Sequence, residues 1–399
     1  MSLLVKEMKI NVKSLTYWVI VIILGLFAFS QIGGDLTGIS KPTPNQSDYG
    51  MTQTDDPQVI QESAYQMLLV EYVSNSYSSY PYGFIKSVHL SDTKQQEIEE
   101  ILTSASGKTI EALTEDYINS VTPDAKIEST FPVKEDHSYE KFQADMRQAA
   151  GMIGKKSNYE EETYRSAAFA PRTYEQALED FQIIVEKDQV SGAYARMVCD
   201  YFGIILALMP IFPAAAAMVR DKRAKAQQVI FTKQTSTGKL IISRYLSCVL
   251  LLLVPVLLFS LMPGMQTLMI AESVDASGNL LLFYQYILGW LLPTIMAVVG
   301  IGFMLTELTN GIVTVVFQLI AWLGTVFTGS GTLVGAVGWS LVPRFNTVGD
   351  RDIFEAILPE LIKNRLAWSV VGLMCCGGTI LLADYKRKGG RLLGKRPKA

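Results

Sequence analysis

Few side chains in this chain have the types and spacing that chemistry on a substrate requires. The run Ser106-Gly107-Lys108-Thr109 has the ending of a phosphate-binding loop, in which backbone N–H groups and a lysine hold phosphate oxygens. Such a loop also needs a glycine five positions before Gly107 and a buried strand ahead of it. That position is Leu102, and the surrounding pattern is helical. We therefore interpret the run as the end of one helix followed by the start of another.

The histidines and cysteines do not predict a catalytic or metal site either. His89 and His137 have Asp92 and Asp136 nearby in sequence, as do most residues of this acidic region, and neither has a nucleophile partner. The four cysteines lie in or beside apolar runs, where packing is their expected role. We expect no catalytic residue, no metal ligand and no bound cofactor in this chain.

The strongest chemical pattern is a basic segment between two apolar runs, residues 220–244, with seven Lys/Arg against one Asp. A basic segment between membrane spans belongs on the cytoplasmic side. Residues 224–233 contain no Pro or Gly and predict a short helix, with Val229, Ile230 and Phe231 close together at its end. An exposed apolar tip suits docking to a soluble partner. The alternative is a charge anchor that has no partner.

The elements that carry this segment are predicted from charge-free apolar runs long enough to cross a bilayer. Hydrophobic residues make up 49% of the chain and are concentrated in such runs. The fold class is an all-α polytopic membrane protein with six transmembrane helices, and positive charge places both termini inside. The predicted spans are residues 14–32, 198–219, 240–262, 280–305, 311–328 and 366–383. An amphipathic interfacial helix (1–13), a cytoplasmic coupling segment (220–239) and a basic cytoplasmic tail (384–399) complete the inner side.

The N-terminus also permits a second interpretation. Its positive start, its apolar core and the small-x-small run Ala28-Phe29-Ser30 are typical of a cleaved signal peptide. The apolar run is long for that purpose. Under either interpretation the following segment is exported.

Residues 33–197 predict a mostly helical extracellular domain inserted between the first two spans. Helix starts are indicated at Ser91 or Asp92, at Ser138 and at Thr173, which are residue types that cap helix N-termini. No alternating strand pattern competes over any length. Binding of a partner, binding of a substrate and shielding of an exit path all remain open for this domain.

Residues 329–365 predict an outer segment that re-enters the membrane, followed by an interfacial helix near 353–362. Gly331, Gly335 and Gly338 permit close backbone approach in its first part. The alternative is a loose outer loop with an apolar patch.

No Asp, Glu, Lys, Arg or His lies deep inside a predicted span. Ion-coupled carriers generally need such a residue or a broken-helix ion site. Energy for transport would therefore come from a separate ATPase that acts on the inner segments.

With these features the chain resembles the permease subunits of bacterial ABC-2-type ABC exporters. The resemblance rests on the amphipathic start Lys6-Glu7-Met8-Lys9, the large insertion after the first span and the five later spans. It also rests on the basic segment, from Val219-Arg220-Asp221-Lys222-Arg223 to Ser243-Arg244-Tyr245-Leu246. In that family the segment forms a coupling helix that docks into the nucleotide-binding subunit, and a re-entrant stretch precedes the last span.

The resemblance implies a non-catalytic permease subunit of an ATP-driven exporter in the bacterial cytoplasmic membrane. Its partners would be an ABC ATPase that binds ATP and Mg²⁺, a second permease protomer (identical or related) and the lipid bilayer, with no nucleic acid. The substrate would be a peptide, an antibiotic or a lipid-like amphiphile. The expected ATPase-docking residues are Arg220, Asp221, Lys222, Arg223, Gln227, Gln228, Val229, Ile230, Phe231 and Glu307.

Polar or kinked positions facing the second protomer are candidates for the substrate path. They are Pro210, Pro213, Gln318, Gly331, Gly335 and Gly338. A glutamine inside a span can instead form a helix-packing hydrogen bond. Two other function classes remain open: a membrane sensor with a helical outer domain, and a polytopic membrane enzyme with its polar residues in 329–365.

Overall fold

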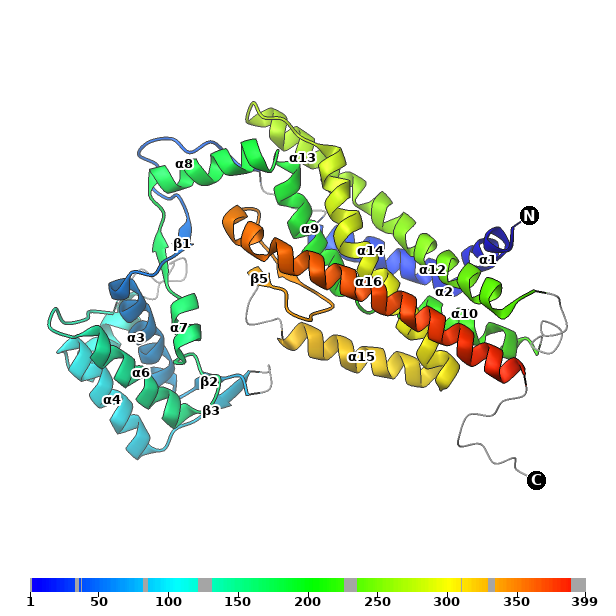
Figure 1. Cartoon of the computed structure of the whole chain (residues 1–399). Helices are drawn as coiled ribbons and strands as arrows, with labels where there is room; N and C mark the ends of the chain where they lie inside the picture. The colour runs from blue at the N-terminus through cyan, green and yellow to red at the C-terminus, as the bar shows by residue number, and fades with distance from the viewer. Residues whose placement is uncertain are drawn as a thin grey trace, which may run out of the picture. The chain divides into compact units, whose positions relative to one another are not determined.

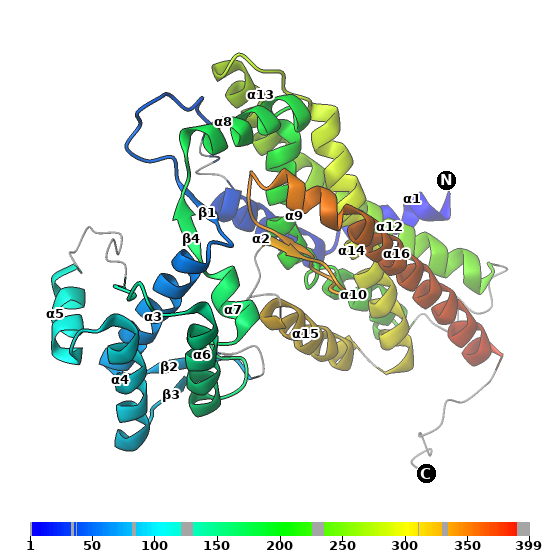
Figure 2. The same ribbon diagram turned by 60° about the vertical axis from the view of Figure 1, so that its left-hand side comes forward.

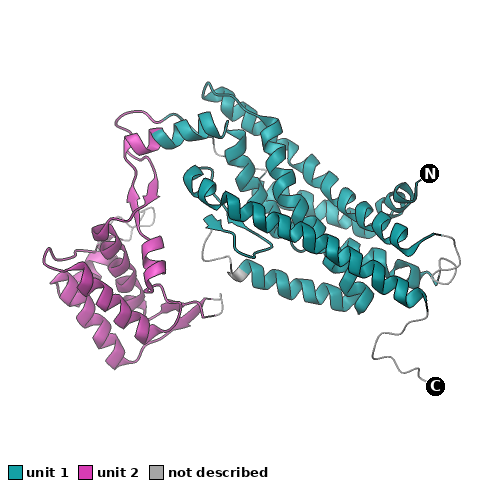
Figure 3. Ribbon diagram, in the orientation of Figure 1, with its two compact units in different colours: residues 1–41, 179–399 teal, residues 42–178 magenta. Residues whose placement is uncertain are grey.

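The computed structural model describes residues 2–32, 36, 38–81, 85–120, 131–225, 235–309, 311–328 and 334–388. The chain divides into two compact units, shown in separate colours in Figure 3. We call Met1–Lys41 together with Glu179–Ala399 the bundle, and Pro42–Leu178 the inserted domain.

The bundle is built from long apolar helices (Figure 1). They are α1 (Leu3–Val12), α2 (Leu15–Ile32), α9 (Ser191–Leu206), α10 (Ile211–Arg223), α12 (Thr237–Phe259), α13 (Leu261–Ser273), α14 (Leu280–Leu308), α15 (Gly311–Thr328) and α16 (Arg351–Arg387). The short strands β5 (Val334–Ala336) and β6 (Arg344–Phe345) pair in antiparallel fashion. Helix α8 (Tyr174–Gln182) and a π-helical turn (Ile183–Lys187) lead from the inserted domain into α9.

The described part of the chain contains five helical segments long and apolar enough to cross a membrane. They are Leu15–Ile32, Ser191–Arg223, Thr237–Ser273, Leu280–Leu308 and Arg351–Arg387, and a shorter apolar helix covers Gly311–Val326. This confirms an all-α polytopic membrane protein. Five segments, not the six predicted, meet the length and hydropathy requirement among the described residues.

Helix α14 is the centre of the bundle and packs against α9, α10, α12, α15 and α16. Figure 1 and Figure 2 both show α14 and α16 side by side. Their backbones touch at Gly300 and Gly372, where a Cβ on Gly300 would overlap the carbonyl oxygen of Gly372. Small residues at a helix crossing allow such close approach, and here they bring the two longest helices of the bundle together.

Several helices begin or end at residues other than those predicted. Some of these differences occur at prolines, and others occur where apolar sequence continues beyond a predicted span. The second predicted span consists of two helices, α9 and α10, separated at residues 207–210. Pro210 directly precedes α10. Pro213 lies in the first turn of α10, where a backbone N–H has no partner within the helix and proline is tolerated. Pro263 likewise lies in the first turn of α13, a helix that lies almost entirely beyond the third predicted span. The expected interfacial helix and last span form one helix, α16, which contains Pro359.

The inserted domain is mostly helical around its own core. Its helices are α3 (Pro57–Ser74), α4 (Asp92–Ser106), α5 (Ile110–Ser120), α6 (Tyr139–Ile153) and α7 (Glu161–Ser166). Two short antiparallel pairs, absent from the prediction, join β1 (Met51–Gln53) to β4 (Phe169–Pro171) and β2 (Tyr77–Ser79) to β3 (Lys86–Val88).

The local signals in this domain have direct structural counterparts. Ser91 is the N-cap residue of α4, and the Ser138 hydroxyl accepts the Lys141 N–H at the start of α6. Gly107 adopts φ 73° and ends α4, and α5 begins at Ile110. The run that ends like a phosphate-binding loop is therefore a helix C-terminus followed by a helix start, as interpreted.

Candidate functional site

The site is the end of the bundle where α10 stops and α12 starts, which we call the loop end. A buried carboxylate, Glu7 of α1, binds both helices: Arg220 Nη2 of α10 donates to Glu7 Oε2 at 2.5 Å, and Arg244 Nε of α12 donates to Glu7 Oε1 at 3.3 Å. Arg244 Nη2 also donates to Asp221 Oδ2 at 2.5 Å. We call Glu7, Arg220, Asp221 and Arg244 the Glu7 network.

Glu7 lies on the face of α1 that packs against the bundle, where it is buried. Residues four apart lie on one helix face, and Asn11 occupies the next turn above Glu7. Asn11 Nδ2 donates to Ser247 Oγ at 2.9 Å, and Arg220 Nη1 donates to Asn11 Oδ1 at 3.3 Å. One face of α1 therefore fixes α1 to both helices that flank the basic segment.

The Glu7 network has equal numbers of positive and negative groups and is largely shielded from solvent. The side chains of Glu7 and Arg244 are each 5% exposed, whereas that of Arg220 is 25% exposed. Two guanidinium groups face two carboxylates, so the cluster carries no formal net charge. Because a buried ion pair is costly when one partner is lost, the network holds α1, α10 and α12 in one arrangement.

A second set of contacts joins the last turn of α16 to the same end. Arg387 Nη1 donates to the carbonyl oxygen of Thr235 at 2.9 Å, and Thr237 Oγ1 donates to Asp384 Oδ1 at 3.3 Å. Lys386 Nζ lies 2.7 Å from Glu307 Oε1 at the end of α14. Residues 235 and 237 of the basic segment are thus bound to α16.

The predicted docking residues divide into three groups. Arg220 and Asp221 are engaged in the Glu7 network, and Glu307 is paired with Lys386. Two more, Lys222 and Arg223, are exposed at the end of α10. The remaining ones, Gln227, Gln228, Val229, Ile230 and Phe231, lie outside the described residues.

The described path residues lie at the start of α10, on α15 and in the segment before α16. Gln318 Nε2 donates to the carbonyl oxygen of Ala207 at 2.6 Å. This buried amide therefore provides a hydrogen-bond donor for a backbone carbonyl at the break between α9 and α10. That contact fits the helix-packing alternative. Pro210 is buried at the start of α10, and Pro213 is half-buried.

The glycine positions have a different setting. Gly335 has φ 84° in β5, and Gly338 has φ 45°, values at which only glycine is unstrained. The carbonyl oxygen of Gly338 accepts a hydrogen bond of 2.7 Å from Asn364 Nδ2 of α16. Gly331 lies outside the described residues. The segment before α16 is therefore fastened to that helix.

Sequence reasoning missed a second charge layer at the opposite, far end of the bundle. Asp188 accepts two hydrogen bonds from Arg196, at 2.6 and 2.8 Å, and also pairs with Arg351. Asp200 accepts two from Arg344, at 2.8 and 3.2 Å. The sequence did contain a signal for this layer. Arg196 and Asp200 lie four residues apart in an apolar helix, and charges in such a helix need buried partners.

The charge-free stretch of α16 is about as long as a bilayer core is thick. Along α16, the stretch from Arg365 to Lys386 rises about 31 Å at 1.5 Å per residue and holds no charge before Asp384. A hydrocarbon core is about 30 Å thick. The bundle therefore has the charge distribution of a membrane protein, with ionisable side chains at both boundaries and an apolar interior between them.

A family model described as "ABC-2 family transporter protein" matches residues 14–343, which is most of the chain. No curated protein and no solved structure matches it.

Proposed function

Because the chain belongs to the ABC-2 family of transporter proteins, we propose that it is the permease subunit of an ATP-driven exporter whose ATP hydrolysis occurs in a separate subunit. Permeases of this family are generally non-catalytic, with the ABC ATPase as their usual partner. The exported substrate would be a peptide, an antibiotic or a lipid-like amphiphile. ATP and Mg²⁺ would bind to the ATPase alone.

The observation that carries the proposal is the Glu7 network. The basic segment leaves α10 beside Arg220 and enters α12 ahead of Arg244, and both arginines bind one carboxylate. Displacement of the segment by an ATPase would therefore move α1, α10 and α12 together. The bond from Arg387 to Thr235 extends the same displacement to α16.

The distribution of Lys and Arg supports a cytoplasmic location for the loop end. The described residues there include Lys6, Lys9, Lys222, Arg223 and Lys225, which are exposed and have no carboxylate partner among the described residues. At the far end, by contrast, most arginines are buried against carboxylates. An excess of free Lys and Arg marks the cytoplasmic face. Both termini and the basic segment would then face the cytoplasm of a bacterial cell.

A second permease protomer would cover apolar surface that the bundle leaves exposed. On α2, Ile22 is 58% exposed and Phe29 72% exposed; on α15, Ile312 is 77% exposed. Such faces contact either lipid or another helix. We propose that two protomers, identical or related, form the substrate path where they meet.

Site-specific photo-crosslinking in the native membrane tests the docking assignment. The photoreactive amino acid benzoylphenylalanine would replace Phe231 of the basic segment, with Ile118 of the inserted domain, 59% exposed, as the matched control position. We expect a nucleotide-binding subunit to be crosslinked from position 231 and not from position 118. Crosslinks to a kinase or to lipid alone would contradict the docking assignment.

A further inference from the structure

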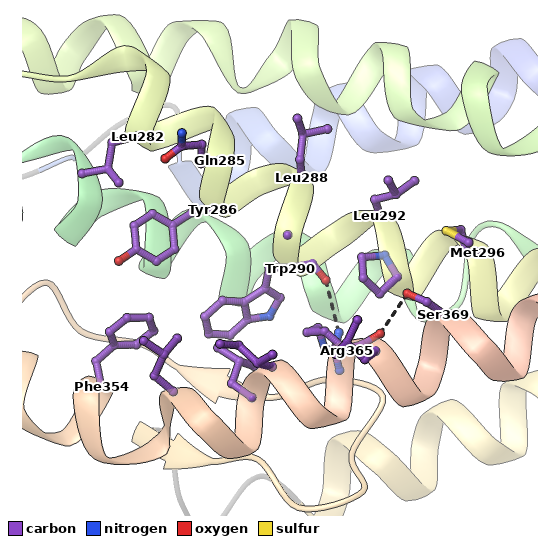
Figure 4. Close-up of a pocket in the computed structure, with 16 residues that line it drawn as sticks. Leu282, Gln285, Tyr286, Leu288, Trp290, Leu292, Met296, Phe354, Arg365 and Ser369 are labelled. Atoms are coloured by element: carbon purple, nitrogen blue, oxygen red, sulfur yellow. Dashed lines mark hydrogen bonds between the residues drawn. The ribbon is translucent and has the colours of Figure 1, made fainter.

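The bundle contains a largely apolar cavity of about 490 Å³ between α14 and α16. Figure 4 shows it bounded by side chains of both helices. Its apolar walls include Leu282, Tyr286, Leu288, Leu292, Leu358 and Ile362. Cavities of about 300–1,000 Å³ with apolar walls and a few polar groups accommodate small organic ligands.

One polar group at this cavity is Arg365, whose guanidinium is buried without an acidic partner among the described residues. Its donors meet neutral oxygens only: Asn364 Oδ1 at 2.9 Å, Thr294 Oγ1 at 2.8 Å and the carbonyl oxygens of Trp290, Ser340 and Leu341 at 3.2, 3.2 and 3.3 Å.

The other arginines buried in the bundle contrast with Arg365. Each of Arg196, Arg244 and Arg344 binds a carboxylate. Burial of an uncompensated charge is costly, so an anion beside Arg365 would be favoured.

Another polar group at the cavity is the indole of Trp290, which is 3% exposed. Its Nε1–H has no hydrogen-bond partner in the part of the chain that the structure describes. By contrast, Nε1 of Trp18, Trp322 and Trp368 each donates to a carbonyl oxygen. A buried donor without an acceptor is rare in proteins and indicates that something else supplies the acceptor.

The position of the cavity indicates where its occupant comes from. Arg365 lies about one hydrocarbon thickness along α16 from Lys386 of the loop end. The rim includes apolar side chains that are exposed on the bundle surface, Leu366 at 62% and Ile362 at 51%. The cavity therefore opens through apolar surface at the depth of lipid headgroups.

We propose that this cavity binds an anionic phospholipid of the surrounding bilayer. An acidic headgroup oxygen accepts the Trp290 Nε1–H and lies beside the Arg365 guanidinium. An acyl chain lies between α14 and α16, against Leu288 and Leu292. The ligand supplies the negative charge and the acceptor that the described residues do not.

Two glycines provide a matched pair of variants for the test. A Cβ at Gly289, which lines the cavity, or at Gly377 of α16 meets no atom within 4 Å. Leucine at either position raises helix propensity, and its Cβ has room there. Gly289→Leu fills the cavity, whereas Gly377→Leu adds the same side chain elsewhere.

Lipid binding would be measured by native mass spectrometry of the purified full chain, titrated with phosphatidylglycerol or phosphatidylcholine. We expect the wild type and Gly377→Leu to bind phosphatidylglycerol at least about tenfold more tightly than phosphatidylcholine, because hydrogen bonds to charged groups are strong. We expect Gly289→Leu to lose this tight site. Arg365→Gln should reduce the preference to about twofold or less while weaker binding of both lipids persists.

Equal phosphatidylglycerol binding by the two leucine variants would overturn the proposal. Displacement of the lipid by millimolar inorganic phosphate would also overturn it, because the site would then take a free anion. Because Arg365→Gln removes several buried hydrogen bonds, its thermal melting must be recorded. If that variant does not fold, the leucine pair and the phosphate competition still decide the outcome.

Discussion

Removal of the Glu7 carboxylate is the substitution that bears most directly on the loop end. In Glu7→Ala, Arg220 and Arg244 lose their shared acceptor while remaining partly or fully buried. Breaking a buried ion pair costs about 3–5 kcal/mol. Because Arg244 keeps Asp221 and Arg220 is 25% exposed, we expect the lower end, about 3 kcal/mol. The matched control is Lys6→Ala, which removes an exposed charge from the neighbouring position of α1.

The assay is a double-mutant cycle with thermal unfolding of the purified chain in detergent or lipid nanodiscs. We expect Glu7→Ala to lower the unfolding midpoint by several degrees and Lys6→Ala to leave it unchanged. The combined Glu7→Ala/Arg244→Ala variant should be less destabilised than the sum of the single variants, with a coupling energy of about 1–3 kcal/mol. Additive effects, or equal midpoints for the Glu7 and Lys6 variants, would refute the reasoning.

Three further outcomes follow from the described contacts. Asp200→Asn leaves the Arg344 guanidinium with a neutral partner at the far end, and we expect a loss of about 3 kcal/mol in a melting experiment and faster proteolysis after residue 334; unchanged proteolysis would contradict the role of this pair. Burial lowers the pKa of His137 in the inserted domain, so the unfolded state binds protons more readily. Stability of that domain should therefore fall as the pH drops below about 6.5, and His137→Gln should flatten this dependence; an unaltered pH profile would exclude His137 as its source. Gly300→Leu forces α14 away from Gly372 and should cost about 3 kcal/mol or more, visible as poor yield of folded protein.

The parts of the fold that sequence predicted correctly are those that depend on local pattern. Charge-free runs indicated the long apolar helices, and Ser138 indicated the start of α6 because a hydroxyl satisfies free N–H groups there. The sequence did not predict where one helix ends and the next begins, because α13 continues the apolar sequence after α12 with Pro263 in its first turn. The pattern of apolar residues does not say where a helix bends or breaks.

The partners of the charged side chains depend on packing that local pattern does not contain. Glu7 and Arg244 are 237 positions apart and meet only because α1 packs on α12. The basic segment was identified, but its attachment to α1 and α16 was not. Arg365 was predicted at the end of an outer segment, and the sequence did not indicate that it lines a cavity between α16 and α14.

The measurement that tests the account most directly is co-purification of the tagged chain from its native membrane, followed by an assay of ATP hydrolysis. The matched samples are the wild type, a variant with Val229, Ile230 and Phe231 replaced by Ser, and a control with the exposed residues Val73, Ile85 and Ile118 replaced by Ser. The account predicts an ATPase with the wild type and the control, and its loss from the first variant. Absence of any nucleotide-binding subunit from the wild-type complex, or its retention by the 229–231 variant, would contradict coupling through the basic segment.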